Sequence, residues 1–427
     1  MYPNVSLLKG LYRRFLFSIF ALIIYRLGTY LTIPGVDVRA LQEIFANYQK
    51  GFLGVFNVFS GGALGRMTIF ALNVMPYIIA SIIFQLLAVS FPSLSNLRSE
   101  GESGKKKMNF YIRCATVLFC IVQGSFIVIG LKNMNASQPI ILKEAEDFFI
   151  VIALFTLIGG TMFLIWLGEQ ITIHGIGNGI SLIIFTGIVS ELPASLSSFF
   201  MMGRIGELST FTVIFMIFFF VMLLWLIVFV EQSYRKVMVK YPRRQVASKL
   251  YGDNVSYIPL KINMSGVIPP IFANALLLFP VAIANFSPDN FISSNILLYF
   301  SHGSPLYILC HVLFIIFFCF FYVGFVFNPD ETADNLKKGG GLILGYRPGR
   351  DTAAYFKKVV FKITILGSIY LGFICVVPEI INSEYGLSFA ISGTSLLIIV
   401  NVITDVFLQV QTYFFTQHYD QLNNRFK

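Results

Sequence analysis

Side chains that could carry out catalysis or bind a metal ion are sparse in this sequence. The four histidines lie far apart, and the five cysteines all fall within apolar segments, at no spacing typical of metal ligands or of a disulfide framework. No Walker, HExxH or GxSxG motif occurs. The glycine-rich run from Gly175 to Gly179 does not match GxGxxG, and it predicts a tight turn between two helices. We therefore expect no enzyme activity, no metal ion and no cofactor.

Charged groups within apolar segments would indicate proton or sodium coupling, because each costs about 2.5–3.5 kcal/mol at the centre of a membrane. Here Glu169, Glu231 and Asp405 lie near the ends of such segments, and the middles contain no carboxylate. The polar residues inside are amides: Asn73, Gln85, Gln123 and Asn274. Amides join helices by hydrogen bonds worth about 0.6 kcal/mol on average. They therefore fit either a helix interface that opens or ordinary helix packing.

These side chains must be positioned by helices that cross a membrane. Of the 427 residues, 56% are hydrophobic and only 12% are charged, and the mean hydropathy is +0.76. Soluble domains carry about 25% charged residues. We predict an all-α polytopic membrane protein in which apolar runs of about 20 residues form the spans. Ten runs qualify: 12–32, 66–90, 110–131, 148–168, 176–193, 211–230, 264–285, 306–327, 358–381 and 388–410.

One stretch, Gly51 to Leu87, has an unusual pattern. The apolar piece from Phe52 to Phe59 would rise only about 12 Å as a helix, against a bilayer core of about 30 Å. Ser60-Gly61-Gly62 ends it, and Arg66 then opens a full span with Pro76 near its middle as an expected kink. Non-helical backbone inside a membrane requires burial in protein or a water-filled cavity. The stretch indicates a pore or binding cavity, with an amphipathic surface helix before an ordinary span as the alternative.

Val74 and Ile78 lie four residues apart beside Pro76, so they share a helix face near the centre of the predicted span. Apolar residues in such a place can form a dry constriction that blocks ions by dewetting. The same periodicity also fits a face that contacts lipid or the protein core.

Basic residues are distributed unevenly among the segments that connect the predicted spans. With a cytosolic N-terminus, most lysines and arginines fall on cytosolic segments. The external segments hold only Arg39, Lys50, Lys132, Lys143 and Arg204. An excess of Lys and Arg marks the cytosolic side, so we expect both termini to be cytosolic. The first apolar segment is long and lacks a small-residue cleavage site, so we expect no cleavable signal peptide.

Two predicted cytosolic loops, 232–263 and 328–357, contain signals for local structure. In the first, alternating Val237 and Val239 and the extended run from Val255 to Ile262 predict a hairpin.

The second loop begins with Asn328-Pro329-Asp330-Glu331, which predicts a helix start with an N-cap, a first-turn proline and first-turn acids. This helix would run to Lys338 and stop at Gly339-Gly340-Gly341. Asp351 or Thr352 is predicted to cap the ninth span.

Arginines lie at the predicted tips of both loops: Arg243, Arg244, Arg347 and Arg350. Such tips suit docking to something large and acidic, such as ribosomal RNA or the acidic face of a cytosolic motor. The alternative is that they only enforce topology, since basic residues collect on the cytosolic side of any such protein.

Several motifs, in order and along nearly the whole chain, closely resemble one family, bacterial SecY, the channel subunit of the Sec protein translocase. The matching runs are Phe56-Asn57-Val58-Phe59-Ser60-Gly61-Gly62-Ala63-Leu64, Met75-Pro76-Tyr77-Ile78, Glu100-Gly101-Glu102-Ser103-Gly104, Trp166-Leu167-Gly168-Glu169-Gln170-Ile171, Gly175-Ile176-Gly177-Asn178-Gly179-Ile180-Ser181, Phe327-Asn328-Pro329, Glu331-Thr332-Ala333-Asp334-Asn335-Leu336-Lys337-Lys338, Arg347-Pro348-Gly349 and Gly393-Thr394-Ser395-Leu396-Leu397-Ile398.

The resemblance implies ten transmembrane helices in two pseudo-symmetric halves of five around a central pore, with a re-entrant plug half-helix. The implied ranges are an N-tail at 1–11, an N-terminal half at 12–193 with the plug at about 52–62, an external hinge loop at 194–210, a C-terminal half at 211–410 and a cytosolic C-tail at 411–427.

The resemblance also implies roles for particular residues. The pore ring would be Val74, Ile78, Ile184, Ile271 and Ile398. The plug would include Gly54, Val55, Phe56, Asn57, Val58, Phe59, Ser60, Gly61 and Gly62. Gln85 and Asn263 would be polar contacts of a lateral gate. Arg243, Arg244, Arg347 and Arg350 would dock a motor or the ribosome.

The implied function is a protein-conducting channel in the bacterial cytoplasmic (inner) membrane, which passes unfolded secretory polypeptides and releases hydrophobic segments sideways into lipid. The implied partners are SecE-like and SecG-like small membrane subunits, a SecA-type ATPase, the ribosome, signal sequences, nascent polypeptides and membrane lipids. The alternative function is a secondary transporter of a small solute, since broken helices also occur there. The absence of mid-span carboxylates counts against it, and no acidic pair supports a membrane-embedded transferase.

Overall fold

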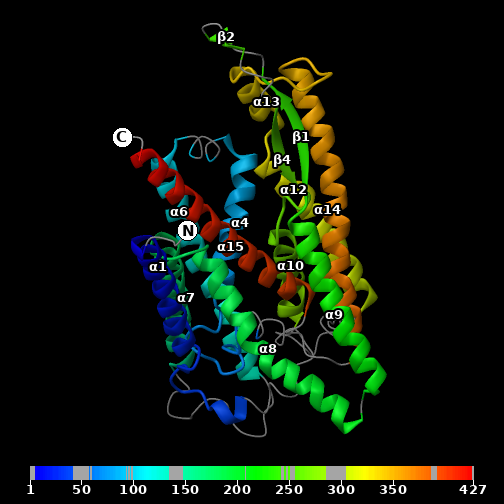
Figure 1. Cartoon of the computed structure of the whole chain (residues 1–427). Helices are drawn as coiled ribbons and strands as arrows, with labels where there is room; N and C mark the ends of the chain where they lie inside the picture. The colour runs from blue at the N-terminus through cyan, green and yellow to red at the C-terminus, as the bar shows by residue number, and fades with distance from the viewer. Residues whose placement is uncertain are drawn as a thin grey trace. The chain divides into compact units, whose positions relative to one another are not determined.

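The computed structural model describes residues 5–41, 57, 60–92, 94, 97, 100–133, 148–206, 208–241, 245–246, 249–250, 255–284, 304–385 and 392–425. These residues are mostly helical, and their strands form two short antiparallel pairs (Figure 1). The chain divides into two compact units. Unit 1 comprises 1–213, 275–308 and 378–427, and unit 2 comprises 214–274 and 309–377.

Among the described residues, seven helices are long and apolar enough to cross a membrane. They are α6 (Glu102–Asn133), α7 (Phe149–His174), α8 (Gly179–Ile205), α9 (Thr210–Glu231), α12 (Pro305–Val326), α14 (Arg350–Tyr385) and α15 (Gly393–Arg425). The predicted membrane class is confirmed. Three further apolar helices are α1 (Val5–Gly28), α4 (Met75–Ser90) and α10 (Ile268–Ala284). The count of ten spans stays a prediction, because α4 and α10 are short and α1 carries several arginines.

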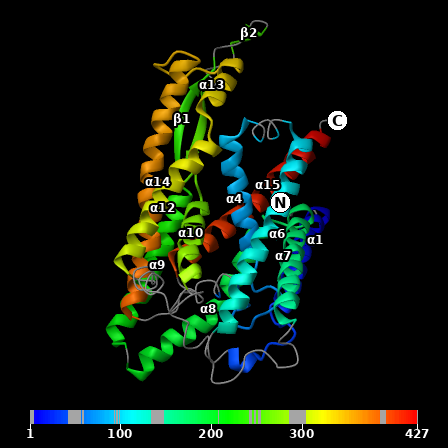
Figure 2. The ribbon, with the colours of Figure 1, turned by 180° about the vertical axis from the view of Figure 1, so that it is seen from behind.

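In unit 1, neighbouring helices pack in chain order. Helix α4 packs on α6, α6 on α7 and α7 on α8, while α1 contacts α7 and α8, and α15 contacts α8 (Figures 1 and 2). The outward faces of these helices are rich in large apolar side chains, such as Phe155 and Trp166 on α7. Helices with such outward faces suit a lipid surrounding, because their apolar side chains then contact hydrocarbon and not water.

The glycine-rich run between α7 and α8 forms the predicted tight turn. Gly177 has φ +83°, and the side chain of Asn178 caps α8 by accepting hydrogen bonds from the N–H groups of residues 180 and 181. Two distant helices hold the turn: Ser18 Oγ of α1 accepts from Ile176 N at 3.0 Å, and Gln409 Oε1 of α15 accepts from Gly177 N at 2.7 Å.

Helix α8 is longer than predicted. It runs to Ile205 and therefore occupies most of the range 194–210 that was predicted as an external loop. Pro193 lies inside the helix, and α8 bends along its course (Figures 1 and 2). A proline kinks a helix by removing one hydrogen bond, yet the chain can continue as a helix beyond it. Gly206, with φ +89°, ends α8.

Unit 2 contains the predicted hairpin. Strand β1 (Tyr234–Lys240) pairs antiparallel with β4 (Val255–Lys261), with Val237 opposite Ile258. The short pair β2 (Gln245–Val246) and β3 (Lys249–Leu250) lies between them in the chain. Lys240 also exchanges backbone hydrogen bonds with Leu342 at 2.8 Å in both directions. The second loop is thereby attached to the hairpin.

A hydrophobic cluster supports this hairpin. The buried members are Val237, Val239, Leu260, Val323, Ile343, Phe356, Val360 and Ile363. They come from β1, β4, α12, α14 and the loop before α14. Alternating side chains of the strand therefore anchor the hairpin to the ends of two long helices.

Helix α13 (Pro329–Lys338) has the predicted bounds. The side chain of Asn328 accepts hydrogen bonds from Asp330 N and Glu331 N, so the N-cap is confirmed. The predicted cap of the ninth span is wrong. Helix α14 already begins at Arg350, so Asp351 and Thr352 lie in its first turn, where Thr352 Oγ1 donates back to Arg347 O at 2.9 Å.

Candidate functional site

The second predicted span begins later than its apolar sequence indicated. Helix α4 starts at Met75, and residues 60–74 form successive turns. Met67 and Asn73 have φ of +45° and +51°, which a right-handed helix excludes. Pro76 therefore lies in the first turn of α4, where its missing N–H costs nothing, and it is not the predicted mid-helix kink.

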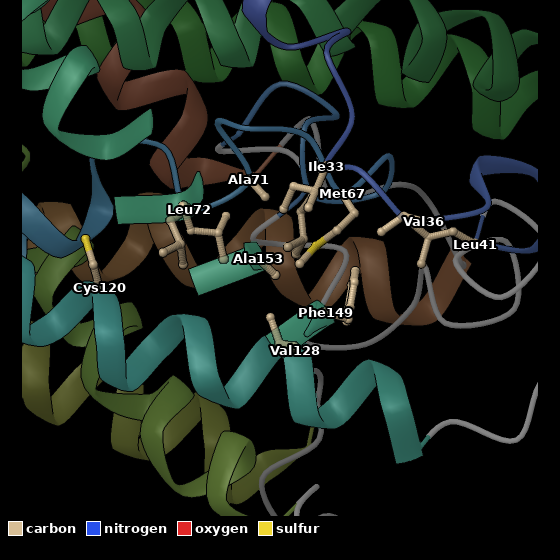
Figure 3. Close-up of a cluster of buried hydrophobic side chains, with 12 residues drawn as sticks. Ile33, Val36, Leu41, Met67, Ala71, Leu72, Cys120, Val128, Phe149 and Ala153 are labelled. Atoms are coloured by element: carbon tan, nitrogen blue, oxygen red, sulfur yellow. The ribbon is translucent and has the colours of Figure 1, made fainter. Parts of the chain in front are cut away.

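The turn segment 60–74 is buried in protein, as non-helical backbone at membrane depth requires. Leu64, Met67, Ala71 and Leu72 of this segment join one hydrophobic cluster. The other members come from residues 33–41, α6 and α7: Ile33, Val36, Leu41, Cys120, Val128, Phe149, Ala153 and Leu157. Figure 3 shows these side chains pointing toward one another between the turn segment and the two helices.

Backbone groups of the segment find partners outside any helix. Ile33 N donates to Met67 O at 2.9 Å, and Ile69 N donates to Leu31 O at 3.0 Å, which forms a single bridge between the two segments. Thr68 N and Thr68 Oγ1 both donate to Ala63 O, at 3.0 and 3.2 Å. Pairing of this kind meets the obligatory hydrogen bonds of a buried backbone.

The described plug residues form one small network. Gly62 N donates to Asn57 O at 2.8 Å, Gly65 N donates to Asn57 Oδ1 at 2.7 Å, and Ser60 Oγ donates to Asn57 O at 3.0 Å. Asn57 is therefore tied directly to the turns that follow it. The remaining predicted plug residues, Gly54, Val55, Phe56, Val58 and Phe59, lie outside the described residues.

A cluster of charged and polar groups surrounds the first turns of the segment. Arg26 Nη1 of α1 donates to Gly61 O at 3.2 Å and to Ser190 Oγ of α8 at 2.8 Å. Arg66 lies 4.6 Å from the centre of the Tyr30 ring. Arg66 also forms a hydrogen bond to the Tyr30 phenol. Glu191 of α8 interacts electrostatically with both Arg66 and Arg26.

The predicted pore-ring residues occupy different elements. Val74 is the fully buried residue that immediately precedes α4, and Ile78 follows it in the first turn, where Ile78 N donates to Val74 O at 3.1 Å. Ile184 in α8 and Ile398 in α15 are buried, and Ile271 in α10 is half-buried. Four of these positions belong to unit 1 and Ile271 belongs to unit 2. Their ring arrangement stays a prediction.

The two predicted gate residues have different surroundings. Gln85 in α4 is half-buried, and its Nε2 donates to Ser81 Oγ at 3.3 Å within the same helix. Asn263 is only 3% exposed, and its amide bonds inside unit 2. Nδ2 donates to Glu231 Oε1 at 2.7 Å and to Gly266 O at 3.2 Å, while Oδ1 accepts from Ser265 Oγ and Gly266 N. In this structure Asn263 organises the turn between β4 and α10, and its gate role stays a prediction.

An ion pair joins two helices of unit 1. Arg113 Nη2 of α6 lies 2.6 Å from Glu169 Oε1 of α7 and at the same distance from the other carboxylate oxygen. The sequence placed Glu169 near a span end but did not indicate that it pairs with Arg113, because 56 residues separate them.

Of the predicted docking residues, Arg347 and Arg350 are described and exposed. They flank the tip between α13 and α14, where the Tyr346 and Tyr355 rings lie 4.5 Å apart. Arg243 and Arg244 lie outside the described residues. Docking by these arginines stays a prediction.

Within the described part of the chain, no three His, Cys, Asp or Glu side chains are grouped so that they could hold a metal ion. The candidate site is the buried irregular segment 60–74. Charged side chains contact the beginning of this segment, and the hydrophobic cluster packs against the rest of it.

Comparisons with known proteins agree over nearly the whole length. The SecY family model matches residues 68–407. The SecY translocase subunit of Rickettsia typhi is 48% identical over 420 residues, which is 98% of this chain and 97% of that protein. That of Escherichia coli K12 is 44% identical over 417 residues, covering 97% and 94%.

Solved structures share the fold. A SecY structure concerned with the plug domain and the closed state of the translocation channel matches with a TM-score of 0.64 at 18% identity, covering 94% of this chain and 92% of that one. Sec61 in a canine ribosome-channel complex matches with a TM-score of 0.60 at 15% identity, covering 94% and 92%. With the family model spanning well over half of the chain and relatives above 40% identity along nearly all of it, the chain belongs to the SecY family of protein translocase subunits.

Proposed function

We propose that this chain is the protein-conducting channel subunit of a Sec translocase. It passes unfolded secretory polypeptides across the bacterial cytoplasmic membrane and releases hydrophobic segments sideways into the lipid. The observation that carries the proposal is the match to SecY translocase subunits, at 48% identity across 98% of the chain. The buried irregular segment 60–74 adds support, because a helical membrane protein tolerates such backbone only where it is enclosed by protein or lines a cavity.

The pore in this proposal is lined by the two pseudo-symmetric halves and sealed by the ring of Val74, Ile78, Ile184, Ile271 and Ile398, with the plug on one side. Apolar residues suit this role because a narrow dry ring blocks ions without any charge. Val74 and Ile78 also lie at the start of α4, directly after the segment that leads from the plug. Movement of that segment would thus reach the ring through a short, continuous stretch of chain.

Sideways release follows from partitioning. About ten apolar residues at −0.3 to −0.6 kcal/mol each give about −3 to −6 kcal/mol for a segment that moves into lipid. This gain exceeds the loss of a few amide contacts at about 0.6 kcal/mol each. Polar segments lack the gain and continue through the pore. Signal sequences and membrane lipids are thereby both partners of the channel.

Energy for movement comes from other proteins in this proposal. A SecA-type ATPase or the ribosome docks on the cytosolic loops, with Arg243, Arg244, Arg347 and Arg350 as contacts, and SecE-like and SecG-like subunits complete the complex. Solved structures of the same fold include Sec61 in a ribosome-channel complex and the yeast Ssh1 complex bound to the 80S ribosome. The exposure of Arg347 and Arg350 suits docking to an acidic surface. Both chain termini then lie in the cytosol.

Reconstitution tests the function directly. The chain would be purified with its small subunits, placed in liposomes and supplied with a SecA-type ATPase, ATP and a labelled secretory precursor. We expect the precursor to become resistant to external protease in an ATP-dependent manner, and to lose that resistance when detergent is added. Protein-free liposomes provide the control. Uptake of small solutes without any precursor protection would contradict the proposal and favour a secondary transporter.

A further inference from the structure

The charged cluster around residues 60–66 is not accounted for by the pore ring, the gate or the docking loops. It joins three stretches of unit 1 that are far apart in sequence: the end of α1, the turns after the plug range, and the middle of α8. Arg26, Arg66 and Glu191 are half-buried, and taking charged groups partly out of water is costly unless they are paired or hydrogen-bonded.

Arg26 connects the three stretches through one nitrogen atom. Its Nη1 donates to Gly61 O at 3.2 Å and to Ser190 Oγ at 2.8 Å. Tyr25, the residue before it, donates from its hydroxyl to Ser60 O at 3.4 Å. The end of α1 therefore holds two successive carbonyl groups at the start of the turn segment.

Glu191 and Arg66 both lie beside Gly62. A β-carbon added to Gly62 would collide with Glu191 Oε1 and would lie 3.3 Å from Arg66 Nη2. One β-carbon on Gly61 would lie 2.9 Å from Gly187 Cα. Both glycines have positive φ, +65° and +79°. The backbone thus approaches α8 at a distance that only glycine permits, and the approach brings Gly62 and Arg66 close to the Glu191 carboxylate.

This cluster acts on the plug range through Asn57. The N–H groups of Gly62 and Gly65 donate to the backbone and side-chain oxygens of Asn57, at 2.8 and 2.7 Å. Whatever holds residues 60–66 against α1 and α8 therefore also holds Asn57. Opposite charges attract over several ångströms, so the Glu191 carboxylate favours the positions of Arg66 and Arg26 near it.

We propose that Arg26, Arg66, Ser190 and Glu191 form a latch that holds residues 60–66 against α1 and α8 and sets how readily the adjoining plug is displaced. This inference rests on the proposed channel function. The latch opens when the turn segment leaves α1 and α8, because Gly61 O then separates from the Arg26 guanidinium and Arg66 moves away from Glu191. It is a positioning device, since none of its members needs to touch the translocating chain.

Cysteine labelling tests the latch without any transport. Ala63 is 0% exposed, so a cysteine at this position (Ala63→Cys, native cysteines replaced) should react slowly with a maleimide in membranes. Glu191→Gln and Ser190→Ala should each raise the labelling rate about fivefold or more, as expected when hydrogen bonds or attraction to a charged group are lost. Asp405→Asn is the matched control, because Asp405 is an exposed carboxylate on α15. It should leave the rate unchanged.

A transport readout separates failure of the latch from failure of the channel. In the same membranes, the latch variants should export a precursor with an impaired signal sequence better than the parent does, and a normal precursor about equally well. Ser190→Ala keeps every charge, so it serves if Glu191→Gln accumulates poorly. Labelling rates that equal the parent's in both variants would overturn the latch, even where normal export proceeds. Absence of export in parent and variants alike, with the labelling differences present, would count against the channel function alone.

Discussion

At the scale of single residues, Asn263 is a polar side chain of unit 2 with several hydrogen bonds. Its amide forms bonds to Glu231, Ser265 and Gly266, and Glu231 itself is only 5% exposed. A buried carboxylate that loses a hydrogen-bond donor keeps its desolvation cost and loses the compensation. The Asn263 amide therefore fixes the turn before α10 and also compensates for the burial of the Glu231 carboxylate.

We predict that Asn263→Ala lowers the free energy of unfolding by about 1–3 kcal/mol, the usual cost of leaving a buried polar partner without its bond. Asn263→Asp should be more damaging, since it places a second carboxylate beside Glu231. Thermal unfolding of the purified complex in detergent would measure both. Gln123→Ala is the control amide, because the Gln123 oxygen makes no hydrogen bond among the described residues. An aspartate variant as stable as the alanine variant would contradict this account of Asn263.

At the scale of elements, the packing of α7 on the turn segment depends on Gly160. A β-carbon at Gly160 would collide with the backbone oxygen of Ile69 and lie 2.9 Å from Ile69 Cγ2, whereas one at Gly159 would meet nothing within 4 Å. Backbone cannot move aside as cheaply as a flexible side chain. Close approach at Gly160 is therefore what lets the irregular segment sit against the helix.

The two neighbouring glycines give a matched pair of variants. Gly160→Ala should destabilise the protein by about 1–3 kcal/mol through overpacking. Gly159→Ala should be neutral or stabilising by up to about 1 kcal/mol, since alanine is the better helix former. Resistance of the membrane-embedded protein to heat and protease would rank the variants. Equal behaviour of the two alanine variants would show that the turn segment does not press on α7 as described.

Elements whose signals are local could be predicted from sequence. The cap at Asn328 and the alternation around Val237 predicted α13 and the β1–β4 hairpin, because each depends on side chains a few residues apart. The start of α4 could not be predicted in this way. Residues from Met67 into the helix are mostly apolar, with only Thr68 and Asn73 polar before Met75. The positive φ at Met67 and Asn73, in a segment packed against residues 31–33 and α7, delays the helix to Met75.

At the scale of the whole molecule, motif order along the chain was enough to indicate the family, but not the charged cluster. Arg26, Arg66 and Glu191 come from three separate segments, and no spacing rule connects them. In the sequence, Arg66 was interpreted only as the start of a span, and nothing singled out Glu191. Their association depends on glycines that allow the turn segment to approach α8, which is a property of the fold and not of any local pattern.

The central claim is that a polypeptide passes through the ring of apolar residues, and site-specific photocrosslinking tests it most directly. A photoreactive amino acid would replace Ile78 or Ile271, with Val151 on α7 as the control, in cells loaded with a stalled secretory chain. Val151 is 51% exposed on a spanning helix, as expected for a lipid-facing position. We predict adducts with the stalled chain at both ring positions and none at Val151. No adduct at either ring position, with the protein inserted and the stall confirmed, would contradict the account.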